Sequence, residues 1–214
     1  GWDIANAGVD YVCSILPVLF TATQVFSDPG DFVILQQPVY YPFMEVIRDN
    51  ERKVVSSDLV LGNDNRYHID FSDFENKIIQ NNVKLFFLCS PHNPVGKVWS
   101  KEELLRLGEI CLRHKVIVVS DEIHNDFIFE GQHNVFTSLN EELANVTITC
   151  TSPSKTFNLA GTLISNIFIS NPELRKKFKK QVNAAGISQL SVFGIKACQT
   201  AYQHGLEWFT SVKK

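Results

Sequence analysis

Short apolar runs alternate along this chain with longer segments whose apolar residues have helical spacing. Five runs rich in β-branched and aromatic residues predict strands, at residues 32–37, 84–89, 116–120, 146–150 and 165–170. The runs are almost continuously apolar, which indicates strands buried on both faces. We therefore expect an α/β fold with three layers, in which helices cover both faces of a mostly parallel (doubly wound) sheet.

The segments between these strands carry helix signals. Ser100 precedes an amphipathic stretch and Glu103 follows three residues later, which is the pattern of a capping box. A second helix is predicted to begin after Asn171 and to end at Gly186. Apolar periodicity over residues 188–214 predicts one further long helix.

Composition and charge exclude several classes of protein. With 44% hydrophobic and 20% charged residues, the chain is neither disordered nor collagen-like. A formal net charge of −3 gives no basic field, so we expect no nucleic-acid partner. The basic run at 175–180 is expected to be a solvated helix face.

The sequence also bears on location. No apolar run reaches membrane-spanning length, and the first residues lack the features of a signal peptide. We therefore expect a cytoplasmic protein that does not enter a membrane. Buried, reduced thiols are expected for the five singly spaced cysteines, which are Cys13, Cys89, Cys111, Cys150 and Cys198.

Chemically useful side chains follow four of the predicted strands. Tyr40, Asn93, Asp121 and Lys155 come after the first four runs in turn. Ligands of open α/β sheets bind beyond the carboxyl ends of the strands, so this ring, amide, carboxylate and amine should lie together. Pyridoxal 5'-phosphate needs such a set: an amine for a Schiff base, a carboxylate for its ring nitrogen, a donor to its phenolic oxygen and a stacking ring.

Neighbouring residues leave alternatives open. Glu122 lies beside Asp121, and one of the two carboxylates could merely cap a turn; we expect Asp121 to be functional and Glu122 structural. Tyr41 lies beside Tyr40, and residue chemistry alone does not separate them. His92, His124 and His133 do not have the spacing of a metal site, so no metal site is expected.

Three motifs carry a family resemblance: SPHNPVGKVW at 90–99, SDEIHND at 120–126 and SPSKTFN at 152–158. In this order and spacing they resemble the fold-type I, pyridoxal-phosphate-dependent aminotransferase superfamily (class I and II). More narrowly, they are similar to its cystathionine β-lyase branch, the cysteine C–S lyases of the MalY/PatB type. Members have an N-terminal segment before this region and a C-terminal small domain after it. The resemblance thus implies that residues 1–214 are the large cofactor-binding domain, with 188–214 the start of a linking helix.

The resemblance also assigns roles. Lys155 would form the Schiff base and then shuttle the substrate's Cα proton, while Asp121 would pair with the pyridinium nitrogen. Asn93 would donate to the phenolic oxygen, and Tyr40 would stack on the ring. Ser152 and Ser154 would lie near the phosphate. The backbone of a loop that leads into a helix with Pro17 at its first position would bind the phosphate through Ser14, Ile15 and Leu16.

Three positions depart from the family pattern. Ser14 replaces a glycine that is usual in the lyases. His124, expected among the cofactor-binding residues, stands where transaminases commonly carry a tyrosine. Leu163 stands where many transaminases have a phosphate-binding arginine. The last two departures resemble the C–S lyases.

The resemblance therefore implies β-elimination of L-cystathionine or another L-cysteine S-conjugate to a thiol, pyruvate and ammonia. The expected partners are a small amino-acid substrate and, by analogy, a second copy in a homodimer. One alternative is an aminotransferase on the same scaffold. Another is a regulatory or binding module that keeps the fold without turnover.

Overall fold

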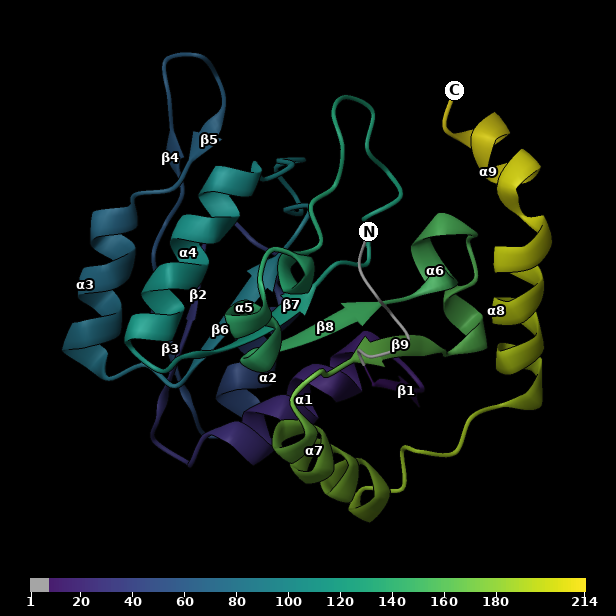
Figure 1. The fold of residues 1–214 in the computed structure, drawn as a ribbon, viewed down its shortest axis with the longest axis horizontal. Coiled ribbons are helices and arrows are strands. Elements are labelled where there is room, and N and C mark those ends of the chain that lie inside the picture. Colours follow the sequence, from purple (N-terminus) through teal and green to yellow (C-terminus); the bar gives the residue numbers. More distant parts are fainter. Residues whose placement is uncertain (1–7) are drawn as a thin grey trace.

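The computed structural model describes residues 8–214 (Figure 1). From β8 to β3 the neighbouring strands are parallel, whereas β9 runs antiparallel to both of its neighbours, so the expected mostly parallel sheet is confirmed. Within the described range the main sheet has seven strands, in the order β1 (Val9–Val12), β9 (Ser165–Phe168), β8 (Thr147–Thr151), β7 (Ile117–Asp121), β6 (Leu85–Cys89), β2 (Phe32–Leu35) and β3 (Lys53–Ser56).

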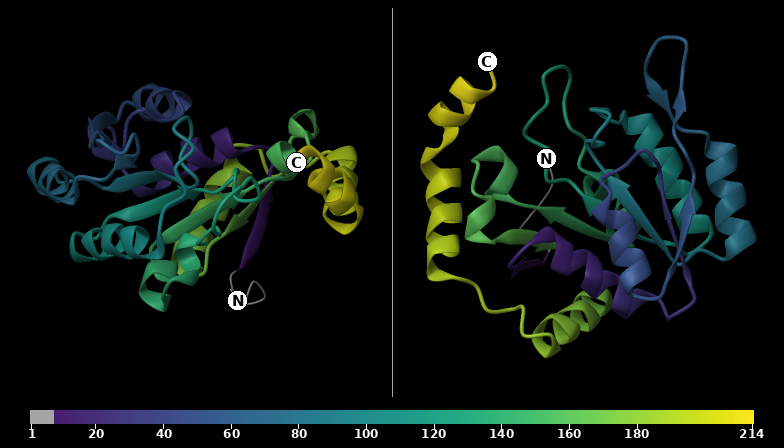
Figure 2. Two further views of the ribbon diagram at one scale, coloured as in Figure 1. Left: turned by 90° about the horizontal axis from the view of Figure 1, so that it is seen from above. Right: turned by 180° about the vertical axis from the view of Figure 1, so that it is seen from behind.

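Helices cover both faces of this sheet, which confirms the three layers (Figure 2). One face is covered by α1 (Ile15–Phe26), α2 (Pro42–Asp49) and α7 (Pro172–Ala184). The other face is covered by α3 (Phe71–Asn81), α4 (Lys101–Arg113) and α5 (Glu141–Asn145). The remaining helices lie toward the β9 side of the sheet: α6 (Pro153–Thr156), α8 (Val192–His204) and α9 (Leu206–Val212). The described chain also contains two short 3₁₀ turns, Phe136–Ser138 and Ala160–Thr162.

The central strands β2, β6 and β7 have continuous apolar sequences because each contributes side chains to two hydrophobic cores. Phe87 of β6 packs edge-on against Phe43 of α2, with ring centroids 5.5 Å apart. Its neighbour Phe86 points to the other face and meets Phe74 of α3 at 4.9 Å. Fully burying one such ring contributes roughly 1.5–3 kcal/mol, so alternate residues of one strand stabilise both helical layers.

All five predicted strands are present, with ends shifted by one or two residues. The strand predicted at 32–37, for example, ends at Leu35. The sequence patterns did not reveal β1, β3 and a two-stranded hairpin of β4 (Val60–Leu61) and β5 (Tyr67–His68). These strands have two to four residues, too few for a period-two pattern to stand out.

The helix predictions fare unevenly. The helix that starts after Asn171 is confirmed as α7, and Gly186 follows it with a positive φ of 70°. The single long helix over 188–214 is wrong: Ser191 caps α8, and the helix breaks at Gly205 before α9. A Cβ at Gly205 would lie 2.5 Å from a ring carbon of Phe157, so the chain turns there against that ring.

The capping box of α4 supplies a stability prediction. Ser100 Oγ accepts from the Glu103 N–H at 3.1 Å, and Glu103 Oε2 accepts from the Ser100 N–H at 2.8 Å. Ser100→Ala should lower the free energy of unfolding by about 1 kcal/mol, measured by urea denaturation, because the Glu103 N–H loses its acceptor. Ser100→Asp keeps an acceptor and should retain most of the stability; equal losses in both variants would contradict this assignment.

Candidate active site

The chemically useful residues lie at one edge of the sheet because β2, β6, β7 and β8 are parallel. Cys89, the last residue of β6, pairs with Asp121, the last residue of β7, and Asp121 pairs in turn with Cys150 of β8. Tyr40 follows β2 and Lys155 follows β8. The carboxyl ends of the four strands therefore deliver an aromatic ring, an amide, a carboxylate and an amine to the same place.

A cavity of about 260 Å³ opens at this edge. All ten residues that the sequence and the family resemblance indicated line it: Ser14, Ile15, Leu16, Tyr40, Asn93, Asp121, His124, Ser152, Ser154 and Lys155. The structure thus brings together residues that lie as far as 141 positions apart, from Ser14 to Lys155. Their roles toward a cofactor stay predictions.

Asp121 and Glu122 have different surroundings. Glu122 is fully buried, where its carboxylate accepts from Ser120 Oγ at 2.9 Å, the Phe136 N–H at 3.1 Å and His133 Nε2 at 2.7 Å. Asp121 faces the cavity and accepts from the Ile123 N–H at 3.2 Å. This agrees with the expectation that Glu122 is structural, because three donors hold it away from the cavity.

The electrostatics of Asp121 follow from its burial. Only 5% of the residue is exposed. Burial raises the pKa of the Asp121 carboxyl from 3.8 to about 7; the Ile123 N–H and the positive charge of Lys155 act in the opposite direction, and the charge of Glu122 adds to the rise. A cation at the carboxylate would restore the ionised form.

Lys155 lies in the four-residue helix α6 and is exposed toward the cavity. Ser152 caps this helix by accepting from the Ser154 N–H at 3.1 Å, and its hydroxyl donates to the Ile164 carbonyl at 2.7 Å. The positive charge of Lys155 acts on two cavity groups, since it lowers the pKa of His124, second to burial, and also that of Asp121.

The amino end of α1 also opens into the cavity. Ser14 is extended and is the N-cap residue, yet its side chain makes no capping hydrogen bond, and the first turn has no acidic residue. The N–H groups and the positive end of the helix dipole are therefore available to an anion. The expectation that Pro17 is the first helical residue is wrong, because α1 begins at Ile15; proline is tolerated throughout a first turn, where its missing N–H needs no partner.

Tyr40 and Tyr41 differ in where they lie relative to the cavity. Tyr40 lines the cavity, whereas Tyr41 is 64% exposed and precedes α2 outside it. Burial, followed by the charges of Tyr41 and Asp121, raises the pKa of Tyr40. Asn93 lines the cavity wall, and its backbone N–H donates to Cys89 Sγ at 3.3 Å.

Part of the cavity wall is not indicated by the sequence. The side chains concerned are mostly apolar or small; they come from the segment before α1, the end of β6, the loop after β7, and the stretch between α6 and the start of β9. They are Cys13, Cys89, Ile123, Ala160, Leu163, Ile164 and Ser165. In the sequence Leu163 stands out only as a departure from transaminases, and it adopts a positive φ of 50° at the end of a 3₁₀ turn.

The family model for aminotransferase class I and II matches residues 13–209. The chain belongs to the class I and II aminotransferase family. Cystathionine beta-lyase PatB of Bacillus subtilis (strain 168) is 42% identical over 209 residues, covering 97% of this chain and 54% of that protein. Protein MalY of Escherichia coli (strain K12) is 31% identical over 211 residues, covering 98% and 53%.

A solved structure of the same family superposes closely. Cystalysin from Treponema denticola, which contains a pyridoxal 5'-phosphate cofactor, has a TM-score of 0.95 and 41% identity, covering 99% of this chain and 54% of that one. The chain spans about half the length of the relatives it matches.

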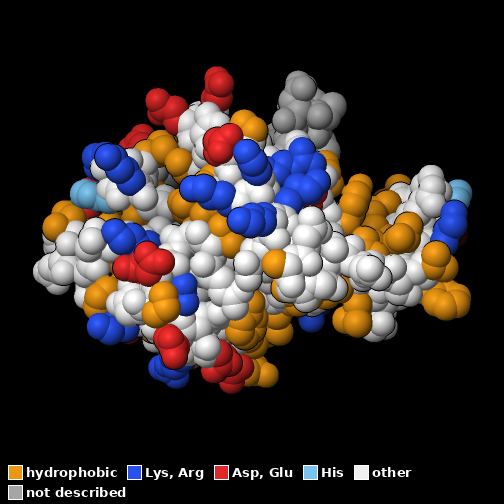
Figure 3. Space-filling view, turned by 90° about the horizontal axis from the view of Figure 1, so that it is seen from below, with side chains coloured by type: hydrophobic (Ala, Val, Ile, Leu, Met, Phe, Trp, Pro, Cys, Tyr) orange, Lys and Arg blue, Asp and Glu red, His pale blue; other side chains and the backbone are white. Residues whose placement is uncertain are grey.

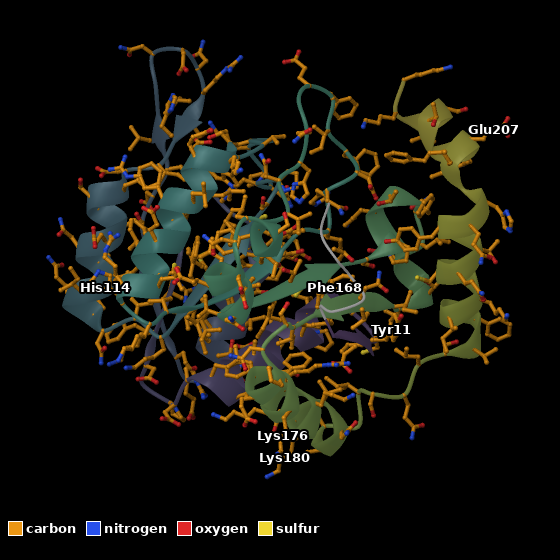
Figure 4. The ribbon with its side chains drawn as sticks, viewed as in Figure 1. Tyr11, His114, Phe168, Lys176, Lys180 and Glu207 are labelled. Atoms are coloured by element: carbon orange, nitrogen blue, oxygen red, sulfur yellow. The ribbon has the colours of Figure 1, made fainter. Side chains whose placement is uncertain are left out.

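The rest of the surface bears on the other expectations. On α7 the side chain of Phe178 is buried and four lysines are exposed, Lys176, Lys177, Lys179 and Lys180, so the basic run is a solvated face as expected (Figures 3 and 4).

The cysteines are all free, and four are buried, whereas Cys13 is half-buried. In residues 8–214 no helix is long and apolar enough to cross a membrane. Nor does the described part of the chain hold three metal-ligating side chains in one group.

The burial of Asp121 predicts a pH-dependent stability. Its carboxyl keeps a proton to higher pH in the folded protein than in the unfolded chain, so stability falls as pH rises from about 4 to about 7. Asp121→Asn, which keeps the acceptor for Ile123, should therefore make the cofactor-free protein more stable by roughly 2–4 kcal/mol at pH 8 and by almost nothing at pH 4.

Chemical denaturation at the two pH values measures this difference. Asp28→Asn replaces an exposed carboxylate and is the matched control, which should leave the pH profile unchanged. If Asp121→Asn is equally stable or less stable than the parent at pH 8, the carboxylate is not the strained group that its surroundings indicate.

Proposed function

We propose that this chain is the large, cofactor-binding domain of a pyridoxal-phosphate-dependent carbon–sulfur lyase. The observation that carries the proposal is that Lys155, Asp121 and the uncapped amino end of α1 all face one cavity. These are an amine, an anion and an anion-binding helix end, the three groups that the aldehyde, ring nitrogen and phosphate of the cofactor require.

The donor set of the cavity fits this cofactor. Asp121 is buried with one N–H donor and no cation bound to it among residues 8–214, and a protonated ring nitrogen would supply that charge. The α1 N–H groups of Ile15 and Leu16 would hold the phosphate, with Ser154 beside them. The cavity of about 260 Å³ lies near the lower limit of small-molecule sites, which span about 300–1,000 Å³.

The bound cofactor supplies an electron sink for negative charge at the substrate Cα. Lys155 would hold the aldehyde end and, once its amine is free, take the Cα proton as general base. Asp121 would keep a proton on the ring nitrogen. Tyr40 would stack on the ring, Asn93 would donate to its phenolic oxygen, and His124 would line the same wall.

For the full-length protein we propose β-elimination of L-cystathionine or another L-cysteine S-conjugate. The Cα–H proton passes to Lys155, the Cβ–S bond breaks, and its electron pair leaves on the thiolate; water then converts the three-carbon remainder to pyruvate and ammonia. The names of PatB and cystathionine β-lyase among the relatives support this reaction. Leu163 in the cavity wall supports it as well, since it offers no cation to a phosphate.

An aminotransferase is the second candidate, and the family itself favours it. The two reactions share proton removal at Cα and differ in the bond that is made or broken next.

We further propose a cytoplasmic homodimer. The five free cysteines support the cytoplasm, and exposed apolar side chains on α8, such as Val192 (69% exposed) and Phe193 (82% exposed), support the dimer. Sedimentation of the full-length protein tests the dimer.

Replacing the amine tests the cofactor assignment. Full-length protein with pyridoxal phosphate should show the yellow absorbance of lysine-linked cofactor, and borohydride reduction should leave the modification on Lys155. Lys155→Ala should lose that absorbance and lower kcat by several orders of magnitude, because the covalent anchor and the general base are the same atom. Lys155→Arg keeps the charge without a usable amine and should fail in the same way.

Retained colour and turnover in either variant, or borohydride labelling of another lysine, would overturn the assignment of Lys155.

Product analysis separates the two candidate reactions. Incubation of the loaded full-length protein with L-cystathionine and no keto acid should release pyruvate, ammonia and thiol in equal amounts. Amine transfer that requires an added keto acid, without thiol release, would identify an aminotransferase instead. A protein that binds the cofactor but does neither would point to the non-catalytic alternative.

A further inference from the structure

The helix that carries Lys155 is tied to the loop that follows Asp121. Thr156 Oγ1 donates to Asp126 Oδ2 at 2.7 Å, across 30 positions of sequence. Thr156 is 2% exposed and directly follows Lys155, and Asp126 comes two residues after His124. One partly buried hydrogen bond therefore joins the segments that bring the amine and the carboxylate to the cavity.

The same two segments are also linked indirectly, through aromatic rings that both pack against α9. Phe157, next to Thr156, packs against Phe209 of α9 with centroids 6.2 Å apart and against Tyr202 of α8 at 5.5 Å. Phe127, next to Asp126, packs against Phe209 at 5.3 Å. A single ring of α9 thus contacts both segments.

The short helix α6 needs such ties. It has four residues, too few to be stable alone. Its first turn is fixed by Ser152, which caps it and donates to the Ile164 carbonyl. Its second half, which carries Lys155, is held by the hydrogen bond from Thr156 to Asp126.

We propose that the Asp126–Thr156 hydrogen bond is a positioning contact that fixes the Lys155 amine relative to the Asp121 carboxylate. A hydrogen bond from a hydroxyl to a carboxylate is stronger than one between neutral groups, and the donor of this one, Thr156, is buried. The Asp126 carbonyl also accepts from Lys213 Nζ at 3.0 Å, which holds the loop against α9. Asp126 and Thr156 act through Lys155 and do not line the cavity.

The charges around Lys155 make its position measurable. The positive charge of Lys155 acts on Asp121 and His124, and the charge of Asp126 acts on Tyr202 of α8. A shift of the amine away from Asp121 weakens its effect on that carboxyl and raises the pKa of Asp121. The pH at which the Asp121 carboxyl loses its proton therefore reports the placement of Lys155 without any cofactor.

Three variants of the full-length protein separate positioning from simple destabilisation. Thr156→Val removes the hydroxyl at nearly constant volume, and Thr156→Ser retains it. Thr147→Val is the matched control, because Thr147 is also fully buried, donates to the Leu143 carbonyl at 2.7 Å, and starts the strand whose far end leads to Lys155.

The first measurement uses cofactor-free protein. The pH midpoint for titration of the Asp121 carboxyl, followed by carbon-13 NMR, should move measurably in Thr156→Val because Lys155 changes its distance from that carboxyl. It should stay at the parent value in Thr156→Ser and Thr147→Val, although the latter also lowers the melting temperature. A midpoint that is the same in Thr156→Val and Thr147→Val would overturn the proposal.

The second measurement rests on the proposed function. Affinity for pyridoxal phosphate should fall roughly tenfold or more in Thr156→Val, recover in Thr156→Ser, and stay unchanged in Thr147→Val. If the parent protein binds no cofactor, the proposed function fails while the titration of Asp121 still decides the role of Thr156. Loss of affinity in proportion to lost stability in both valine variants would also count against positioning.

Discussion

Asp121 pairs with Cys89 on one side and with Cys150 on the other, so three parallel strands end side by side at the mouth of the cavity. The positions of the candidate site residues that follow these strands depend on this register. Each strand continues into a loop at the same edge, and each loop therefore contributes side chains to a shared space. A shift of β7 by one residue would turn Asp121 away from the cavity and Glu122 into it.

Because successive residues point to opposite sides, the adjacent carboxylates Asp121 and Glu122 have different surroundings. Glu122 is satisfied by a hydroxyl, a backbone N–H and a histidine, which makes it a structural group of the core. Asp121 receives one backbone N–H and faces the cavity, and burial raises its pKa to about 7. A carboxyl kept in that condition destabilises the empty protein and is poised to bind a cation.

Much of this could be predicted from the sequence, because continuous apolar strands and the residues that directly follow them are local signals. Asp121, Asn93 and Lys155 were found in that way. Tyr40 could be preferred to Tyr41 only by resemblance, since which ring faces the cavity depends on the turn into α2. The return loop with Leu163 was missed as cavity wall because its contribution depends on contacts that are distant in sequence.

The helix predicted over 188–214 is broken at Gly205, and this break affects the geometry of the cavity. Apolar periodicity continues through residue 205, so the sequence favours one uninterrupted helix, but a Cβ there would come within 2.5 Å of both the Ala201 carbonyl and the Phe157 ring. With glycine at this position the chain bends, and Phe209 reaches Phe127 as well as Phe157. The bend thus places α9 against both segments that deliver charge to the cavity. Because α6 is too short to hold Lys155 by itself, the last helices of the chain contribute to the geometry of a site formed by the strand ends.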